Sequence, residues 1–177
     1  KPYLARFFYG NGTARDVRNS EWRDKEMGVL PDLGSHLLDM ALFLFGKPAT
    51  PFERWSFNRF ENRAYDHVMF ANPGSTPVLE LEATLLSWRN HFSLDVYAEK
   101  GSAHIQCLCK WGPSTLTVRG RVLPSGKPDQ EHFTLECADP TWVAEYEHFL
   151  ELCRLGGTNL ENDLWINSTL NSLGDPK

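Results

Sequence analysis

Three polar residues, Asp32, His36 and Asp39, interrupt an otherwise apolar stretch of the chain. Their spacing of four and then three residues places them on one face of a helix. Asp32 and His36 lie one turn apart, so the carboxylate can contact the imidazole. A carboxylate on one ring nitrogen fixes the tautomer and leaves the other nitrogen free to move a proton. The spacing therefore predicts an acid–base pair; the structural alternative is a packed histidine beside a first-turn acid.

The helix that carries these residues is predicted as one element over 28–46. Pro31 suits its first turn, and Gly46 followed by Lys47-Pro48 is a stop signal. A wide apolar stripe is formed by Leu33, Leu37, Leu38, Ala41, Leu42, Leu44 and Phe45. The opposite face carries Asp, His and Asp instead of a mixture of Lys, Glu and Gln, so we expect it to line a cleft.

Most of the remaining chain has the pattern of β-strands. The predicted strands cover 1–9, 52–60, 65–70, 78–88, 92–99, 103–109, 115–122 and 131–137. Short turns join most of them, which favours antiparallel pairing. Two helices follow, one starting at Asp139-Pro140 and the other covering 160–173. The pattern predicts an α+β fold with a large, mostly antiparallel sheet of six or more strands and helices packed on one face.

Length and charge limit the classes of function. The chain has 177 residues, a length that suits one domain over 1–177. Its net charge is −5. Its Lys and Arg residues are scattered, which gives no electrostatic support for binding nucleic acid. No apolar run reaches the roughly 20 residues of a membrane span. No Gly-rich phosphate loop occurs, so we expect no cofactor-binding residues in this chain.

The four cysteines, Cys107, Cys109, Cys137 and Cys153, do not have the spacing of a zinc site, and we expect no metal. Cys107 and Cys109 would project from one face of a strand. All four are interpreted as buried or half-buried free thiols in a reducing, cytoplasmic compartment.

The five other histidines are weaker candidates for chemistry. Four of them lie in or beside predicted strands with no partner at a telling spacing, and His148 lies on the helix after Asp139. We interpret them as surface or packing residues. The four strand residues are His67, His91, His104 and His132.

Three features of the sequence together suggest a family. They are Trp22, the segment Gly28-Val29-Leu30-Pro31-Asp32-Leu33-Gly34-Ser35-His36-Leu37-Leu38-Asp39 and the later Phe45-Gly46-Lys47-Pro48. Together they resemble the second domain of the glucose–fructose oxidoreductase and inositol dehydrogenase (Gfo/Idh/MocA) family. In that family a Trp-containing loop leads into G-G-G-x-L-x-D-x-G-x-H-x-x-D. Here Glu26 and Met27 stand in place of the first two glycines, and the shape of the loop and the substrate stay open.

The resemblance implies a mechanism and a missing partner domain. His36 matches the proton-transferring histidine, Asp32 its acidic partner and Asp39 a structural acid. His36 would take the hydroxyl proton of a sugar, polyol or related hydroxy compound while hydride leaves to NAD or NADP. An N-terminal Rossmann domain, absent from this chain, would bind the cofactor and supply a catalytic Lys. The isolated chain is therefore expected to be inactive.

Two further expectations concern the substrate and the assembly. Trp22, with Arg18 or Arg23, would cover and orient a polyhydroxylated substrate. The open face of the sheet would serve homo-oligomer contact. The alternatives are a non-catalytic ligand-sensing or dimerisation scaffold of the same fold and a nicotinamide-dependent glycosidase.

Overall fold

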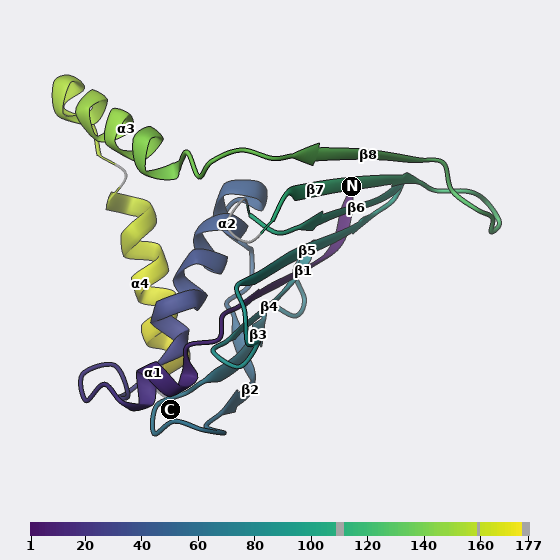
Figure 1. Cartoon of the computed structure of the whole chain (residues 1–177). Helices are drawn as coiled ribbons and strands as arrows, with labels where there is room; N and C mark the ends of the chain where they lie inside the picture. The colour runs from purple at the N-terminus through teal and green to yellow at the C-terminus, as the bar shows by residue number, and fades with distance from the viewer. Residues whose placement is uncertain (109–111, 159, 175–177) are drawn as a thin grey trace.

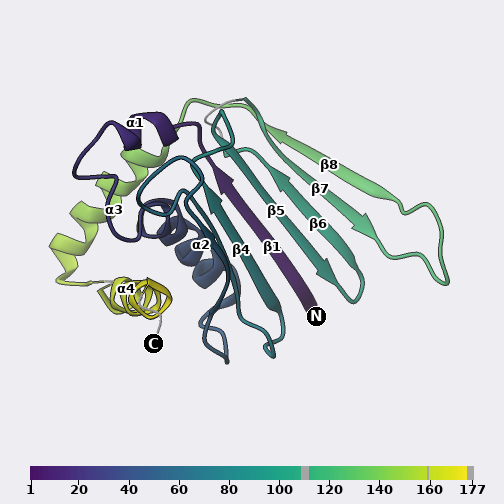
Figure 2. The same ribbon diagram turned by 90° about the horizontal axis from the view of Figure 1, so that it is seen from below.

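The computed structural model describes residues 1–108, 112–158 and 160–174. Eight strands form one sheet in the order β2-β3-β4-β1-β5-β6-β7-β8. Helices α2 (Ser35–Phe45) and α4 (Leu160–Gly174) lie on the same side of this sheet (Figures 1 and 2). The predicted α+β fold with helices on one face is confirmed.

Strand pairing is antiparallel with one exception, the central parallel pair of β1 and β4. The connection from β1 to β4 runs through α2 and two other strands, and so long a crossover permits a parallel pairing. The strands are β1 (Pro2–Gly10), β2 (Glu53–Asn58), β3 (His67–Ala71), β4 (Val78–Thr84), β5 (His91–Ala98), β6 (Gly101–Gln106), β7 (Ser114–Gly120) and β8 (Gln130–Leu135).

Several strands end earlier than predicted, and β4 and β6 do so by the widest margin. β4 stops at Thr84, although the next N–H, of Leu85, still donates to the Asp66 carbonyl of the neighbouring chain segment at 2.8 Å. β6 stops at Gln106, and Cys107 has a φ of 61°. The prediction that Cys107 lies in a strand is therefore wrong, and Cys109 lies outside the described residues.

The burial predicted for the cysteines is only partly right. Cys107 is half-buried, whereas Cys137 and Cys153 are exposed. Cys137 follows β8 and Cys153 lies in α3 (Thr141–Leu155), and neither of these two elements buries any residue.

The helix predicted over 28–46 is divided in two. It opens with a π-helical turn, η1 (Leu30–Gly34), and continues as α2. Pro31 occupies the first turn as predicted, and the N–H of Gly46 closes the helix by donating to the Leu42 carbonyl at 2.9 Å. Gly28 stays outside the helix with a φ of 53°.

The core lies between the sheet and the helices. Leu37, Leu38 and Ala41 of α2 are buried, as are the sheet residues Phe7 and Leu81. From α4, the residues buried in the same core are Ile166, Leu170 and Leu173. Burial of each large side chain stabilises the fold by about 1.5–3 kcal/mol, so the apolar stripe of α2 fixes which of its faces turns outward.

Helix α3 differs from the other long helices because it projects away from the sheet (Figure 1). It begins at Thr141, one residue later than predicted, and the Asp139 carboxylate accepts hydrogen bonds from the Thr141 N–H and hydroxyl at 3.0 and 2.6 Å. Its Trp142 and Tyr146 are 76% and 62% exposed. Only the first turn of α3 takes part in the site described below.

Within the described ranges, no helix has the length and apolar character needed to cross a membrane. Over the same residues, no three His, Cys, Asp or Glu side chains gather in a way that could hold a metal ion.

Candidate active site

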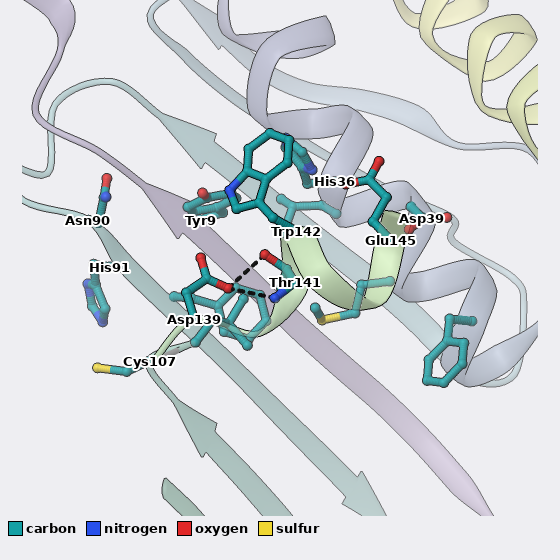
Figure 3. Close-up of a pocket in the computed structure, with 15 residues that line it drawn as sticks. Tyr9, His36, Asp39, Asn90, His91, Cys107, Asp139, Thr141, Trp142 and Glu145 are labelled. Atoms are coloured by element: carbon teal, nitrogen blue, oxygen red, sulfur yellow. Dashed lines mark hydrogen bonds between the residues drawn. The ribbon is translucent and has the colours of Figure 1, made fainter. Parts of the chain in front are cut away.

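The exposed face of α2 borders a cavity of about 470 Å³, and His36 lines it. Asp39 comes from the same face of α2, Tyr9 from the end of β1, and Trp142 and Glu145 from the start of α3 (Figure 3). The remaining lining residues are Leu37, Met40, Phe43, Asn90, His91, Phe92, Cys107, Leu108, Asp139 and Thr141. The imidazole therefore faces a concave site built from five separate parts of the chain.

Tyr9 is one of the residues of this site that the sequence did not single out. Its ring packs edge-on against His36, with centroids 6.0 Å apart, and against Phe92 at 6.3 Å. Burial, and after it the negative charge of Asp32, raises the pKa of Tyr9. Tyr9 therefore holds a neutral phenol beside the imidazole at neutral pH and lies within electrostatic reach of the Asp32 carboxylate. In sequence, Tyr9 was one of several aromatic residues in a strand.

Asp32 is turned toward a different neighbour. Its Oδ2 accepts a hydrogen bond from Nη2 of Arg23 at 3.4 Å, and within the described residues no hydrogen bond joins it to His36. Asp32, Arg23 and Trp22 line a second cavity of about 540 Å³. Asp32 lies in the π-helical turn η1, and His36 lies in the second position of α2.

The structure brings together two of the three residues predicted to bind substrate. Trp22 is 79% exposed, and the Arg23 guanidinium lies 5.9 Å from its ring centroid. Arg18, at the end of α1 (Ala14–Arg18), is exposed and lines neither cavity. Asp39, predicted as a structural acid, is exposed and lines the His36 cavity.

A buried carboxylate fastens the segment that carries Trp22. Asp24 is 5% exposed, and its Oδ1 accepts hydrogen bonds from the N–H groups of Arg63 and Ala64 at 2.7 and 2.8 Å. Two residues further on, Glu26 adopts a φ of 54°, at a position where the Gfo/Idh/MocA pattern has glycine. The segment thus keeps a left-handed turn there without the glycine.

All four strand histidines depart from their predicted roles. His91 lines the His36 cavity. The Nδ1 of His132 lies 3.0 Å from Oγ1 of Thr117, and the Nδ1 of His67 lies 3.9 Å from Oε1 of Glu82. His104 has partners, contrary to prediction: its Nδ1 lies 2.5 Å from Oδ1 of Asp95 and its Nε2 lies 2.8 Å from Oγ of Ser102. Because Asp95 and His104 are paired across β5 and β6, they meet on the open face of the sheet, away from His36.

The cavity has the components needed for general acid–base chemistry. An exposed imidazole can exchange a proton with a hydroxyl group bound within hydrogen-bond reach of it. The aromatic rings of Tyr9 and Trp142 give the cavity apolar walls, and carboxylates supply acceptors for further hydroxyl groups.

Comparison with known proteins identifies the family of the chain. Residues 1–104 match the family model described as the GFO/IDH/MocA C-terminal domain. The chain belongs to this family. The Gfo/Idh/MocA resemblance read from the sequence is thereby confirmed. No curated protein sequence matches the chain.

Several solved structures share this Gfo/Idh/MocA fold. An inferred NADPH-dependent oxidoreductase from Desulfitobacterium hafniense has a TM-score of 0.77 and 17% identity over 98% of this chain and 53% of its own. A UDP-N-acetylglucosamine 3-dehydrogenase from Acidithiobacillus ferrooxidans has a TM-score of 0.73 and 17% identity, covering 97% of this chain and 52% of its own. A levoglucosan dehydrogenase complexed with NADH has a TM-score of 0.61 and 18% identity, and the match covers 80% of this chain and 41% of the dehydrogenase. The chain spans about half the length of these proteins or less.

Proposed function

We propose that the protein containing this chain is an NAD(P)-dependent oxidoreductase that oxidises a hydroxyl group of a sugar, polyol or related hydroxy compound. The observation that carries the proposal is the exposed imidazole of His36, which opens into a cavity with aromatic walls. Membership of the Gfo/Idh/MocA family supports it. The names of two similar structures, a levoglucosan dehydrogenase and a UDP-N-acetylglucosamine 3-dehydrogenase, support a sugar-related substrate.

In this proposal His36 is the proton acceptor, or the donor in the reverse direction. As the carbinol C–H bond breaks, its hydride is accepted by the nicotinamide and the O–H proton passes to the imidazole. Asp32 acts as the acidic partner through its charge. The negative charge of Asp32 contributes to the raised pKa of Tyr9, and the Tyr9 ring packs against His36.

The proposal places cofactor binding mainly on a Rossmann domain of the same protein. The levoglucosan dehydrogenase, of which this chain covers 41%, was solved with NADH. The described lining of the His36 cavity contains carboxylates and no Lys or Arg. Such a lining fits the reacting end of a nicotinamide and its substrate, and does not fit the cofactor phosphates. We therefore expect the isolated chain to be inactive.

Trp22 and Arg23 are proposed to cover and orient the substrate from the second cavity. Arg23 already contacts Asp32 there, and the exposed indole can stack on the apolar face of a sugar ring. Arg18 is kept in the proposal as an outer contact only, since it lines neither cavity.

Homo-oligomer contact is proposed through the open face of the sheet. Across this face, Glu80, Arg6, Asp95 and His104 are directly paired on four neighbouring strands. Trp55, which shares a cavity with Arg6 and Glu80 on this face, is 50% exposed. A surface with alternating charges and exposed aromatic residues can be self-complementary. A cytoplasmic location belongs to the same proposal, and the free thiols of Cys107 and Cys153 support it.

The test is replacement of His36 by Ala in the full-length protein. A positioned proton carrier typically contributes about 10²–10⁴-fold, so we expect kcat to fall by that factor, with either nucleotide as cofactor. His148→Ala is the matched control, because His148 is an exposed histidine of α3 outside the cavity lining. A His36→Ala turnover within a few-fold of the unmodified protein refutes the role of His36. Failure of the unmodified protein to reduce NAD or NADP with any sugar favours the scaffold alternative.

A further inference from the structure

Among the described residues that line the His36 cavity, the acidic and basic side chains other than histidine are all carboxylates. Asp39 lies on α2, Glu145 projects from α3 toward the side of α2 that carries His36 and Asp39 (Figure 3), and Asp139 borders the same space. Among the described residues of the lining there is no Lys or Arg. Neither Asp39 nor Glu145 forms an ion pair with any residue of the described ranges. A concave site lined by one sign of charge concentrates ligands of the opposite sign.

The aromatic walls of the cavity favour the same kind of ligand. Tyr9 and Phe92 line it from the sheet, Phe43 from α2 and Trp142 from α3. Phe43 is 85% exposed and Trp142 is 76% exposed, so their ring faces are open to a ligand. The face of an aromatic ring attracts a cation, and Trp does so most strongly. Carboxylates and aromatic faces together are therefore the environment that an ammonium group prefers.

We propose that this cavity selects a cationic hydroxy compound, an amino sugar or amino polyol, over its neutral and anionic counterparts. The ammonium group lies between Asp39 and Glu145 with the Trp142 ring beside it, and a hydroxyl of the same molecule faces His36. The inference rests on the proposed function and narrows its substrate class. Carboxylates accept hydrogen bonds from neutral sugars as well, but only a cation gains the direct charge attraction, and a uronate is repelled.

The first experiment compares three sugars of similar size on the full-length protein. D-Glucosamine, D-glucose and D-glucuronate differ mainly in the charge they carry at neutral pH. We expect dissociation constants measured by calorimetry at low ionic strength to rise in that order, by about tenfold or more from first to last. Raising the ionic strength should reduce the difference, since these charges are partly open to solvent.

The second experiment assigns the preference to one side chain. In Glu145→Gln, the ratio of the glucose dissociation constant to the glucosamine dissociation constant should fall by about 2–5-fold, as expected for removal of one solvent-exposed ion pair. Glu147→Gln is the matched control: it makes the same chemical change on the same helix, at an exposed residue outside the cavity lining. Its ratio should equal that of the unmodified protein.

The inference is overturned if glucosamine does not bind, if the three compounds bind equally, or if glucuronate binds most tightly. It is also overturned if the ratio of the glucose to the glucosamine dissociation constant is the same in Glu145→Gln as in the unmodified protein. Calorimetry requires no turnover, so the two proposals fail separately. The expected order of binding without any oxidation supports this inference and rejects the proposed function. Oxidation of glucose without a preference for glucosamine rejects this inference alone.

Discussion

Replacing Asp24 by Ala should reduce the free energy of unfolding by about 3 kcal/mol. One carboxylate oxygen of Asp24 accepts two backbone hydrogen bonds, at 2.7 Å from Arg63 and 2.8 Å from Ala64. A hydrogen bond to a charged group contributes about 1.5–3 kcal/mol, and a buried donor left unpaired costs about 1–3 kcal/mol. Ala64 is 1% exposed, so its N–H is inaccessible to water, whereas Arg63 is exposed and water can replace part of the lost bond.

The measurement is urea-induced unfolding of the unmodified chain, Asp24→Ala and Asp24→Asn. The Asn side chain keeps an oxygen that can accept the same two N–H groups without the charge, so its loss should be about half that of Ala. Asp16→Ala is the control, because Asp16 is an exposed carboxylate on α1, and its substitution should alter stability by less than about 0.5 kcal/mol. The reasoning is refuted if Asp24→Ala is as stable as the unmodified chain, or if Asn is as harmful as Ala.

Two further predictions concern the site and the helix that carries it. Burial and the charge of Asp32 raise the pKa of Tyr9, so the folded state favours the neutral phenol. The contribution of this preference to the free energy of unfolding is complete below pH 10.0, the usual pKa of Tyr, and is lost as the pH rises further. Urea midpoints should therefore fall more steeply above about pH 10 in the unmodified chain than in Tyr9→Phe, and equal slopes would contradict this assignment. Leu38→Ala removes a fully buried side chain of α2 and should lower the free energy of unfolding by about 2–5 kcal/mol. The exposed Leu44 is its control, since Leu44→Ala should cost far less; similar losses for the two would show that burial is not the cause.

The strands and helices were largely predictable because their signals are local. Alternation of apolar and polar residues over 78–84 is that of β4, and the stop signal at Gly46 is where α2 ends. The pairing of Asp95 with His104 was also within reach of the sequence. A hairpin that turns at residues 99–100 places these two directly opposite one another. The contact follows from pairing between two strands, which the spacing of residues along the chain does not show by itself.

The π-helical turn shows where a local reading fails. The apolar positions of 28–46 suit one α-helix, and nothing in their spacing indicates a wider first turn. Asp32 lies in that turn, and its carboxylate contacts Arg23. The choice between an α-helical and a π-helical turn depends on contacts made by the completed core, which a window of sequence does not contain.

The sequence alone determined the kinds of element present and the face of α2 on which His36 lies, because one wide apolar stripe has to be buried and the opposite face is left outside. Tertiary structure decided what that face meets. Insertion of β1 between β4 and β5 brings the Tyr9 ring to the imidazole. The first turn of α3 brings Trp142 and Glu145 to the same cavity, although they follow His36 by more than a hundred residues. Contacts between segments so far apart depend on the order of strands in the whole sheet, and no local periodicity encodes that order.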